Sequence, residues 1–396
     1  MANNKFHINK LFKVLKINNK NDLKNTAKEL KISLAQLEFY NNKMILPYKA
    51  DLKKILNFTG YSEFELKIRL GIVDNEIIEW ISNNPEVITK VYCDKNNKES
   101  EKKHSPEFTT DYGRMFRGDC LEIMKQLPDE SMELIFADPP FNLDKNYESG
   151  INDYVSEQEY ILWTEKWLLE CIRILAPGGS MFIYNLPQWN TYISAILNKY
   201  LNFRHWIAIS MKGLMPVTNK LHPEHYGLLY YVKGEKPKVF NKQRIPMETC
   251  RHCGGEIRDY GGKKKDLDPK GLSIPDIFMD INPVRHQKYK NREANELPLK
   301  LLYRIISIAS DEGSTIFDPF GGSGTTYVAA EYLKRKWVGV EIGSINDIIE
   351  RFANNSTDLE LLKSIESQSN VLFTNEQVKL REKNEFWGYE KLEKKI

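Results

Sequence analysis

The sequence predicts an α/β protein with a doubly wound, mostly parallel sheet, preceded by a small all-α domain. Three observations predict this fold class. Residues 1–72 show only helical periodicity. From residue 112 onward, short apolar runs alternate with amphipathic stretches, as in proteins built from parallel strands and crossover helices. Two of the apolar runs end in turns rich in Gly, Pro and Asp, which parallel sheets place at the carboxyl ends of their strands.

Composition and charge exclude several classes of protein. No apolar run reaches the ~20 residues of a membrane-spanning helix, and the start MANNKFHINK lacks the apolar core of a secretory signal. Five cysteines, a small and odd number, favour a reducing compartment, so we expect a cytoplasmic protein. The net charge is only +3, but residues 1–72 hold 14 basic against 6 acidic residues, and residues 201–300 hold 19 against 11. These two basic blocks indicate surfaces that meet a polyanion, or merely solvated lysine-rich faces.

The first block, residues 1–91, is expected to be a helical domain. Two short helices are predicted on either side of a break at Lys31, and a second pair follows them. Two helices joined by a tight turn resemble the helix-turn-helix domains of phage repressors, with a recognition helix over residues 33–40. The side chains that this resemblance turns toward DNA are Gln36, Tyr40, Asn41 and Lys43. The alternative is a helical bundle that packs on the rest of the chain or mediates dimerisation.

The remaining segments divide into a linker, two halves of an α/β domain, an insertion and an extension. Strands are expected at 132–138, 181–185, 205–210, 226–232, 314–318 and 337–342, and helices at 159–175, 297–310 and 325–333, with a LAPGGS turn at 175–180. The expected boundaries are a linker over 92–111, a first half over 112–211, an irregular insertion over 212–295, a second half over 296–345 and a helical extension over 346–396.

A strand, a Gly-rich turn and a helix start come together in TIFDPFGGSGTT, residues 315–326. Glycine lets a ligand approach the backbone closely. About twenty residues on, Glu341 ends the next strand, where a carboxylate accepts hydrogen bonds from ribose hydroxyls. The turn is not G-x-G-x-x-G, and the acidic strand end at Asp318 suits cations better than a pyrophosphate. We therefore expect S-adenosylmethionine, with its sulfonium and ammonium, rather than NAD; the alternative is a purely structural turn.

Asp138-Pro139-Pro140-Phe141 directly follows another predicted strand. The prolines lack N–H donors, so the Asp138 carboxylate and the Pro139 carbonyl remain as acceptors. An exocyclic amino group has two N–H donors, which two acceptors can hold while the nitrogen faces a methyl carbon. Phe141 offers a ring on which an extruded base can stack. By itself, D-P-P is equally typical of a type I turn.

Together, the two motifs resemble those of the DNA amino-methyltransferases, which modify adenine N6 or cytosine N4. The matching residues run from FRGDCLEIMKQLPDESMELIFADPPFNL (116–143) to FDPFGGSGTTYVAAEYLKRKWVGVEI (317–342). The catalytic motif precedes the cofactor motif, as in the permuted β group, whose recognition region lies between them. The resemblance implies a Rossmann-like, seven-stranded methyltransferase sheet with one reversed strand, in which the catalytic strand is the neighbour of the cofactor strand.

The same resemblance implies a role for each matching residue. The residues implied to hold the target base are Asp138, Pro139, Pro140 and Phe141. Those implied to hold the cofactor are Asp119 and Cys120 at its adenine, Glu341 at its ribose, Asp318, Phe320, Gly321, Gly322 and Gly324 at its methionine side, and Thr325, Thr326 and Lys300 at its carboxylate.

The basic insertion is where base-specific contacts are expected, unless it is an ordinary solvated segment. Its candidate phosphate contacts are Lys263, Lys264, Lys265, Arg285, Lys288 and Lys290. It also holds the pair Cys250 and Cys253, which supplies two of the four ligands that a structural zinc needs. His252, His286 or Cys93 would have to complete such a site, so we interpret the pair as reduced cysteines and expect no metal.

The sequence thus predicts a site-specific methyltransferase that moves a methyl group from S-adenosylmethionine to adenine N6 in duplex DNA, within a restriction–modification system. Asp rather than Ser at the head of the catalytic motif favours adenine; cytosine N4 is the first alternative. The others are an RNA substrate and a helix-turn-helix regulator with an inactive methyltransferase domain. The expected partners are duplex DNA with the target base flipped out and a restriction endonuclease for the same site. A homodimer stays open, and no membrane is expected.

Overall fold

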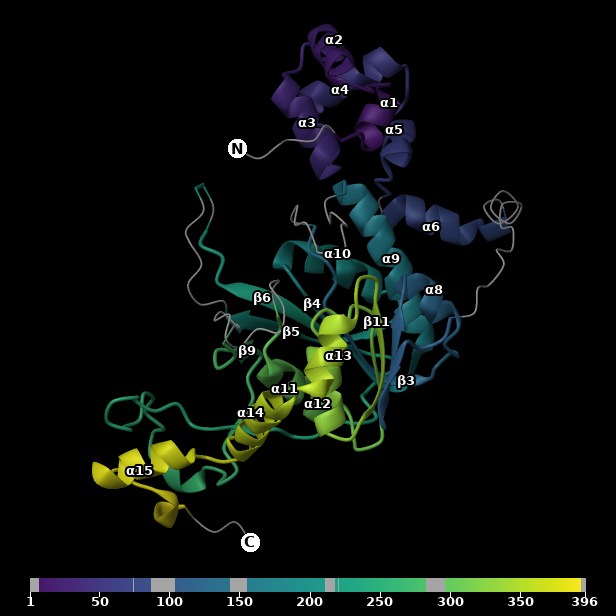
Figure 1. Cartoon of the computed structure of the whole chain (residues 1–396). Helices are drawn as coiled ribbons and strands as arrows, with labels where there is room; N and C mark the ends of the chain where they lie inside the picture. The colour runs from purple at the N-terminus through teal and green to yellow at the C-terminus, as the bar shows by residue number, and fades with distance from the viewer. Residues whose placement is uncertain are drawn as a thin grey trace. The chain divides into compact units, whose positions relative to one another are not determined.

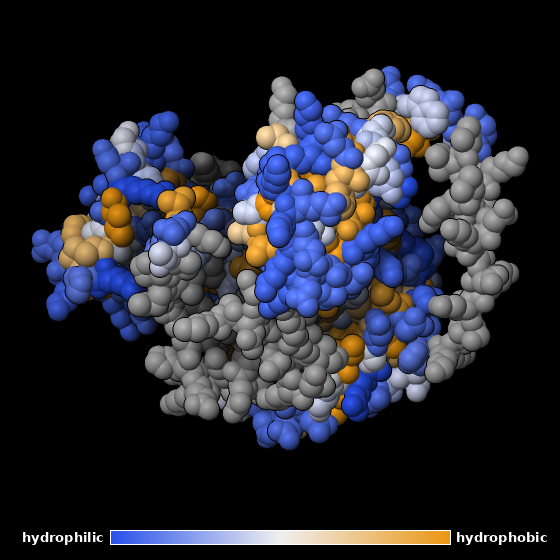
Figure 2. Space-filling view, turned by 90° about the horizontal axis from the view of Figure 1, so that it is seen from above, coloured by the Kyte–Doolittle hydropathy of each residue, from blue (hydrophilic) through white to orange (hydrophobic). Residues whose placement is uncertain are grey.

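The computed structural model describes residues 7–73, 75–86, 104–142, 155–210, 218–219, 221–282 and 296–392. The chain splits into two compact units, residues 1–102 with 154–164 and residues 103–153 with 165–396. On the face shown in Figure 2, hydrophobic residues form separate patches among hydrophilic ones. None of the described helices combines the length and the apolar character that crossing a membrane requires.

The first unit is helical throughout its described residues. Its helices up to residue 83 are α1 (Lys10–Val14), α2 (Lys20–Leu30), α3 (Leu34–Lys43), α4 (Lys49–Thr59), α5 (Glu63–Leu70) and α6 (Asn75–Asn83). Side chains from α1 to α5 share one buried core, which includes Phe12, Leu37, Ile55 and Leu66. The small all-α domain predicted from the periodicity is therefore present.

The predicted break between the two helices of the helix-turn-helix pair lies at Lys31. Lys31 ends α2 in the left-handed conformation, with a φ of 51°, which residues other than glycine seldom adopt. The next N–H, of Ile32, donates to the Ala27 carbonyl (3.1 Å), and the Ile32 side chain is buried. Ser33 then caps α3 by accepting from the Gln36 N–H (3.2 Å). Burial of Ile32 and these caps fix the turn without a glycine.

Two residues predicted to face DNA, Tyr40 and Asn41, are instead buried, with exposed fractions of 1% and 0%. The Tyr40 hydroxyl donates to the Asp51 carboxylate (3.0 Å). Asn41 Oδ1 accepts from the backbone N–H of Asn9 and of Phe12, both at 3.1 Å. The prediction was wrong because Tyr40 and Asn41 follow the core residue Leu37 by three and four positions. At that spacing, all three side chains lie on the same, buried face of the helix.

The second unit contains a mixed, nine-stranded sheet in the order β1-β2-β11-β10-β3-β4-β6-β5-β9. Its strands are β1 (Phe108–Thr109), β2 (Gly113–Arg117), β3 (Met132–Ala137), β4 (Leu175–Asn185), β5 (Asn202–Ser210), β6 (His225–Val232), β9 (Ile277–Phe278), β10 (Thr315–Asp318) and β11 (Lys336–Glu341). The seven central strands are parallel except β6, which is antiparallel to both of its neighbours. This confirms the predicted fold class; the two-residue strands β1 and β9 extend the predicted seven at the edges.

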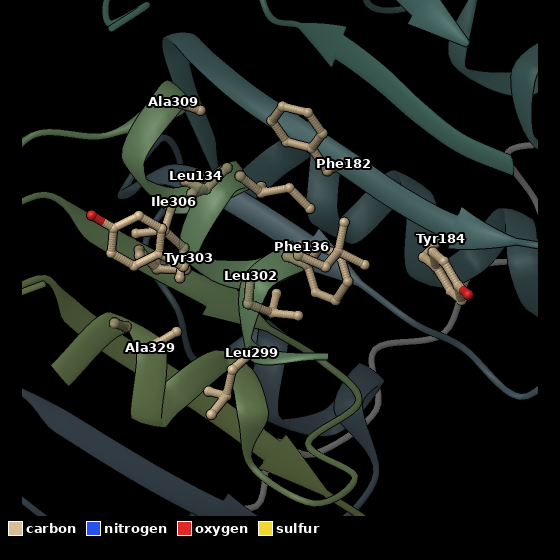
Figure 3. Close-up of a cluster of buried hydrophobic side chains, with 14 of the residues drawn as sticks. Leu134, Phe136, Phe182, Tyr184, Leu299, Leu302, Tyr303, Ile306, Ala309 and Ala329 are labelled. Atoms are coloured by element: carbon tan, nitrogen blue, oxygen red, sulfur yellow. The ribbon is translucent and has the colours of Figure 1, made fainter. Parts of the chain in front are cut away.

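The helices of this unit connect the strands or follow the last one. They are α8 (Cys120–Lys125), the part of α9 (Glu157–Ile174) from residue 165 onward, α10 (Pro187–Leu197), α11 (Leu299–Ala309), α12 (Thr325–Tyr332), α13 (Asn346–Ala353), α14 (Ser356–Ser367) and α15 (Asn375–Lys383). Figure 1 shows α11, α12 and α13 grouped together. Side chains of α11 such as Leu302 and Ile306 gather with Leu134 and Phe136 of β3 in one buried cluster (Figure 3). This cluster fixes the strands whose ends carry both predicted motifs.

The LAPGGS segment, predicted to be a turn, is the first half of β4. Gly178 has a φ of 76°, and the pairing of β4 with β3 shifts register beside it. However, the Gly178 N–H donates to the Lys233 carbonyl (2.7 Å), and the Lys233 N–H donates to the Gly179 carbonyl (3.0 Å). The glycines therefore make an irregular strand instead of a reversal, because the neighbouring strand satisfies their backbone groups.

Part of the irregular insertion folds together with the end of the chain. We call residues 243–273 and 370–392 the C-terminal module; it holds β7 (Arg244–Ile245), β8 (Leu272–Ser273), η2 (Lys263–Asp266), α15 and η4 (Tyr389–Lys391). Its core is formed by Met247, Leu372, Phe373 and Trp387. The Met247 N–H donates to the Leu372 carbonyl (2.9 Å), joining segments 125 residues apart. The predicted insertion and extension are thus partly one structure.

Candidate active site

Three carboxylates lie at the carboxyl ends of adjoining parallel strands. Asp138 follows β3, Asp318 ends β10 and Glu341 ends β11, and β10 pairs with both other strands. The negative charges of Asp138 and Glu341 both raise the pKa of Asp318, which places all three groups within electrostatic reach of each other. The sheet order therefore brings the two predicted motifs to one edge, as expected from the sequence.

Asp318 is the most strongly perturbed of these carboxylates. Its side chain is buried, and burial raises its pKa to about 8. Two hydrogen bonds favour the charged form and lower the pKa, but burial outweighs them. Those bonds come from the Phe320 N–H to Oδ1 (2.9 Å) and from the Thr326 hydroxyl to Oδ2 (2.5 Å). Within the described residues no cationic side chain pairs with Asp318, and a cationic ligand can supply that positive partner.

The Gly-rich turn is bonded directly to Glu341. The Gly322 N–H donates to Glu341 Oε2 (2.8 Å), and the Gly343 N–H donates to Oε1 (2.9 Å). A side chain at Gly321 would meet the Tyr327 hydroxyl at 2.9 Å and the Val340 carbonyl at 3.1 Å. Gly324 has a φ of 78° and caps α12. Glycine is therefore required at 321 by close approach and at 324 by conformation.

The loop at Asp119 and Cys120 adjoins the same strand end. The Gly118 N–H donates to the Glu341 backbone carbonyl (2.9 Å), and the Asp119 side chain caps α8 through the Leu121 N–H (2.9 Å). Asp119 is exposed, whereas Cys120 is buried. Burial and the neighbouring Asp119 raise the pKa of the Cys120 thiol to about 12, so this thiol is neutral and lines the site as a small apolar group.

Three predicted cofactor residues have partners within the protein. Thr326 donates to Asp318, and Thr325 Oγ1 accepts from Arg351 Nη1 (2.9 Å). Lys300 forms an ion pair with Asp280 (2.7 Å). Burial raises the pKa of that carboxyl, but Arg304 and Lys300 outweigh burial and hold it well below its usual range. The predicted contacts of Thr325, Thr326 and Lys300 with a cofactor carboxylate therefore stay predictions.

An aromatic cluster of Phe141, Tyr184 and Tyr226 lies beside the catalytic motif. The Phe141 ring centroid is 6.1 Å from that of Tyr184 and 5.7 Å from that of Tyr226. Burial and then the charge of Asp138 raise the pKa of both tyrosines, so both lie near that carboxylate. Trp189 Nε1 donates to the Phe141 carbonyl (2.8 Å) and holds the segment. Figure 3 shows the Tyr184 hydroxyl pointing away from the buried core.

The two tyrosines were not predicted from the sequence. Tyr184 is the second-last residue of β4, a position that the strand-end rule could have found. Tyr226 is near the start of β6, and it reaches the same edge only because β6 runs antiparallel to β4. A further missed contact joins Phe320 to Trp167, whose ring centroids are 5.2 Å apart. This contact packs the turn after Asp318 against α9.

The predicted DNA contacts are only partly described. Lys263, Lys264 and Lys265 lie on η2 of the C-terminal module, where Lys264 pairs with Glu256 (3.0 Å). Gln36 is partly exposed on α3. Positions that lie outside the described residues, or whose side chains do, are Lys43, Cys93, Arg285, His286, Lys288 and Lys290. Their predicted roles stay predictions.

Arg351, which the sequence analysis did not predict as a site residue, hydrogen-bonds to the Gly-rich turn. Its side chain is 2% exposed and lies between the carboxylates of Glu296 (2.8 Å) and Asp358 (2.6 Å). Its Nη1 donates to the Ser323 carbonyl and to Thr325 Oγ1, both at 2.9 Å. One buried guanidinium thus fixes two successive parts of the turn, and two acids keep it in place.

Replacing Arg351 with lysine should weaken cofactor binding. Lysine keeps the charge between the two acids but loses the planar fork that reaches the turn. The loss of two hydrogen bonds, each worth about 1 kcal/mol, predicts a Kd for S-adenosylmethionine raised by up to about 30-fold. Calorimetric titration measures this, with Arg335→Lys as control, because Arg335 also clamps carbonyls, those of Ser310 and Leu333. A lower Tm with unchanged cofactor affinity would contradict the assignment.

Comparison with known proteins adds to this geometry. Residues 132–350 match the family model described as DNA methylase. Over 365 residues the chain is 47% identical to the type II methyltransferase M.BamHI of Bacillus amyloliquefaciens, covering 91% of this chain and 86% of that protein. Over 238 residues it is 33% identical to the DNA adenine methyltransferase YhdJ of Escherichia coli K12, covering 58% and 78%.

Solved structures also resemble the chain. The PvuII DNA methyltransferase, described as cytosine-N4-specific, aligns with a TM-score of 0.49 at 20% identity, over 66% of this chain and 94% of that one. The M1.HpyAVI–SAM complex aligns with a TM-score of 0.40 at 22% identity, over 61% and 99%.

Proposed function

Because this chain belongs to the DNA methylase family that modifies N6 or N4 amino groups, we propose that it methylates adenine N6 in duplex DNA. Enzymes of this kind serve restriction–modification systems, and the methyl donor is S-adenosylmethionine. One observation carries the proposal: the cluster of Asp138, Asp318 and Glu341 beside the aromatic rings of Phe141, Tyr184 and Tyr226. A cation and a flat base are the two ligands that such a site fits.

The residues present fit the methyl donor. Asp318 is a buried carboxylate with no cationic partner in the described part of the chain, and the ligand carries a sulfonium and an ammonium. Glu341 accepts from the Gly322 N–H of the Gly-rich turn at Oε2 and from the Gly343 N–H at Oε1, and both oxygens keep lone pairs for ribose hydroxyls. S-adenosylmethionine supplies a methyl group on a positively charged sulfur, which leaves as a neutral thioether. The acidic strand ends would hold the positively charged part of the bound S-adenosylmethionine, and Gly321 and Gly322 would let the molecule approach the backbone.

Asp138 and the Pro139 carbonyl are the acceptors for the amino group of the base. They hold its two N–H groups, so that the nitrogen lone pair faces the methyl carbon. Positive charge that develops on this nitrogen during methyl transfer would be stabilised by the Asp138 carboxylate. One amino proton then leaves toward that carboxylate and on to water. Phe141, with Tyr184 and Tyr226 behind it, provides the stacking surface for the flipped base.

Cytosine N4 is the second candidate. Adenine and cytosine present the same edge, an amino group beside a ring nitrogen, so two acceptors at Asp138 and Pro139 hold either base. Adenine is the first candidate because Asp, not Ser, heads the DPPF motif; the similar proteins include both an enzyme named for adenine, YhdJ, and one described as cytosine-N4-specific, the PvuII methyltransferase. The aromatic cluster stacks either ring, because every base has a flat face.

The deciding experiment identifies the modified nucleoside. The full chain is incubated with S-adenosylmethionine that carries a labelled methyl group and with duplex DNA of mixed sequence. The DNA is then digested to nucleosides, which are separated and identified by mass. Label on N6-methyl-2′-deoxyadenosine supports the first candidate, and label on N4-methyl-2′-deoxycytidine the second. DNA without label, or label on a ring carbon, would exclude the proposed chemistry.

A restriction endonuclease for the same site is the partner we propose. DNA modified by this chain should resist cleavage by an endonuclease whose site contains the modified base. A base methylated without any change in cleavage rate would exclude that pairing.

The N-terminal helices are proposed to add contacts to DNA through α3. The support is the helix pair α2–α3 and the partly exposed Gln36 near the start of α3. A side-chain contact to a base is worth about 1–3 kcal/mol, so Gln36→Ala should raise the KM for DNA about tenfold. Asn57→Ala, an exposed amide on α4, is the matched control. An equal KM for both variants and the parent would assign this domain a role other than base contact.

A further inference from the structure

Cys250 and Cys253 form the tip of a small hairpin in the C-terminal module. Thr249 and Glu256 pair as an antiparallel bridge at its base. The Cys250 N–H donates to the Gly255 carbonyl (2.7 Å), and the Gly254 N–H donates to the Cys250 carbonyl (2.8 Å). Both cysteines are free thiols, Cys250 partly exposed and Cys253 exposed. The turn therefore presents two sulfurs together at the surface of the module.

Backbone N–H groups point at both sulfurs. The Gly255 N–H donates to Cys253 Sγ (3.4 Å). The N–H groups of Cys253 and His252 lie near the Cys250 sulfur. Donors around a sulfur stabilise the thiolate, which is the form that binds soft metal ions. A turn that only reversed the chain would need none of these bonds.

The rest of the module holds the turn rigidly. Gly254 has a φ of 77°, and a side chain there would meet Arg381 and Leu380 at 3.1 and 3.2 Å. The buried Arg381 donates to the Gly254 carbonyl (2.5 Å), and Asn384 donates to the Cys253 carbonyl (3.2 Å). Helix α15 and its cap residue Asn384 therefore fix the backbone at the second cysteine and directly after it, so this part of the turn is in place before any ligand arrives.

The pair supplies half of a metal site. Structural zinc takes four ligands in a tetrahedron, commonly four cysteine thiolates. Within the part of the chain that the structure describes, no group of three or more His, Cys, Asp or Glu side chains is placed to hold an ion. Glu256, at the base of the hairpin, is occupied by Lys264, Arg381 and Trp387. The described residues do not supply the other two ligands, and a second copy of this chain can supply them.

We propose that Cys250 and Cys253 bind Zn²⁺ together with the same pair from a second copy of this chain. A two-fold axis through the ion makes one surface turn complementary to itself and supplies four thiolates from two identical halves. The exposure of Cys253 allows the second copy to approach. The cationic Arg251 beside the pair and Arg381 beneath it offset the negative charge of a four-thiolate site.

The test measures metal content and mass together on the full chain. Protein treated with a chelator and desalted is titrated with ZnCl₂, and bound zinc is counted by mass spectrometry. Sedimentation equilibrium gives the molecular mass before and after. We expect about one ion per two chains, a zinc-dependent doubling of mass, and reversal by the chelator. Co²⁺ in place of zinc should give the absorption of a tetrahedral, all-thiolate site.

Two variants make the test specific. The double variant Cys250→Ser with Cys253→Ser should lose zinc binding and dimer formation while it keeps methyltransferase activity as a monomer. His252→Ala, in the same turn, is the matched control and should bind as much zinc as the parent. One ion per monomer, no bound zinc, or equal loss of zinc in the His252 variant would each overturn the shared four-thiolate site.

Discussion

Replacing Asp138 with alanine is expected to lower kcat for methyl transfer about 10³-fold, because the variant loses the group that stabilises charge on the amino nitrogen. The carboxylate follows β3 at the edge where β10 and β11 also end. Pro139 adds only a carbonyl, and proline has no N–H to offer. No other acidic side chain of the motif DPPF can replace it.

Cofactor affinity separates this role from a structural one. Asp138 raises the pKa of Asp318, so its removal should ease ionisation of Asp318 and leave cofactor binding intact or slightly tighter. We expect the Kd for S-adenosylmethionine to change by less than about threefold while kcat falls. Single-turnover kinetics and calorimetric titration measure the two quantities. Asp111→Asn, at an exposed aspartate ahead of β2, is the control and should leave both unchanged.

If cofactor binding were lost along with activity, Asp138 would belong to the cofactor site, and the acceptors for the base would lie elsewhere. The tyrosines of the aromatic cluster would then be the next group to vary. Tyr184 and Tyr226 lie near Asp138 and have raised pKa values from burial, so both are neutral hydrogen-bond donors and acceptors at working pH.

Asp318→Asn should have opposite effects on stability and on function. Burial raises the pKa of Asp318 to about 8, well above its value of 3.8 in an unfolded chain. Between these two values the folded chain keeps a proton that the unfolded chain has lost. The contribution of Asp318 to stability therefore falls as the pH rises from about 4 to about 8, by about 1.4 kcal/mol for each unit of pKa difference.

The asparagine variant lacks this titration. Its amide oxygen still accepts from the Phe320 N–H, and its NH₂ can donate to the Thr326 hydroxyl oxygen, so the local bonds persist. We expect the variant to be more stable than the parent at pH 8 and to lose that advantage toward pH 4. Urea unfolding at several pH values measures the difference. A difference that does not depend on pH would contradict a raised pKa at Asp318.

The same substitution should weaken cofactor binding roughly 50-fold, because it removes one buried negative charge from the site of a cation. In the parent, cofactor affinity should rise with pH up to about 8, since binding favours the charged carboxylate and releases its proton. Titration in buffers of different ionisation enthalpy detects that proton. Glu312→Gln, at an exposed acid before β10, is the control and should keep both affinity and proton release.

The cofactor turn shows how much of the site a local pattern predicts. Gly321 and Gly324 are required by a close approach and by a positive φ, and both requirements are written in the motif itself. By contrast, Lys300 matched a position by resemblance, and its partner turned out to be Asp280, twenty residues away. The positive charge of a lysine does not identify its partner. The sequence therefore could not show whether Lys300 pairs with a carboxylate of the protein or with the carboxylate of the ligand.

The N-terminal helices show the opposite balance of success and error. The break at Lys31 and the start of α3 followed from local capping chemistry. The burial of Tyr40 and Asn41 did not, because both are polar and the helix is only weakly amphipathic along its length. Their partners, Asp51 and Asn9, come from α4 and from the start of the chain.

The sequence by itself determined the fold class, the order of the motifs and the placement of Asp138, Asp318 and Glu341 at strand ends. These follow from periodicity and from turn residues, which act over a few positions. Only the tertiary structure decided that Tyr226 joins Phe141, that Arg351 clamps the cofactor turn and that residues 243–273 pack on the end of the chain. Each of these depends on a reversed strand or a buried contact between distant segments, whose geometry no local pattern encodes.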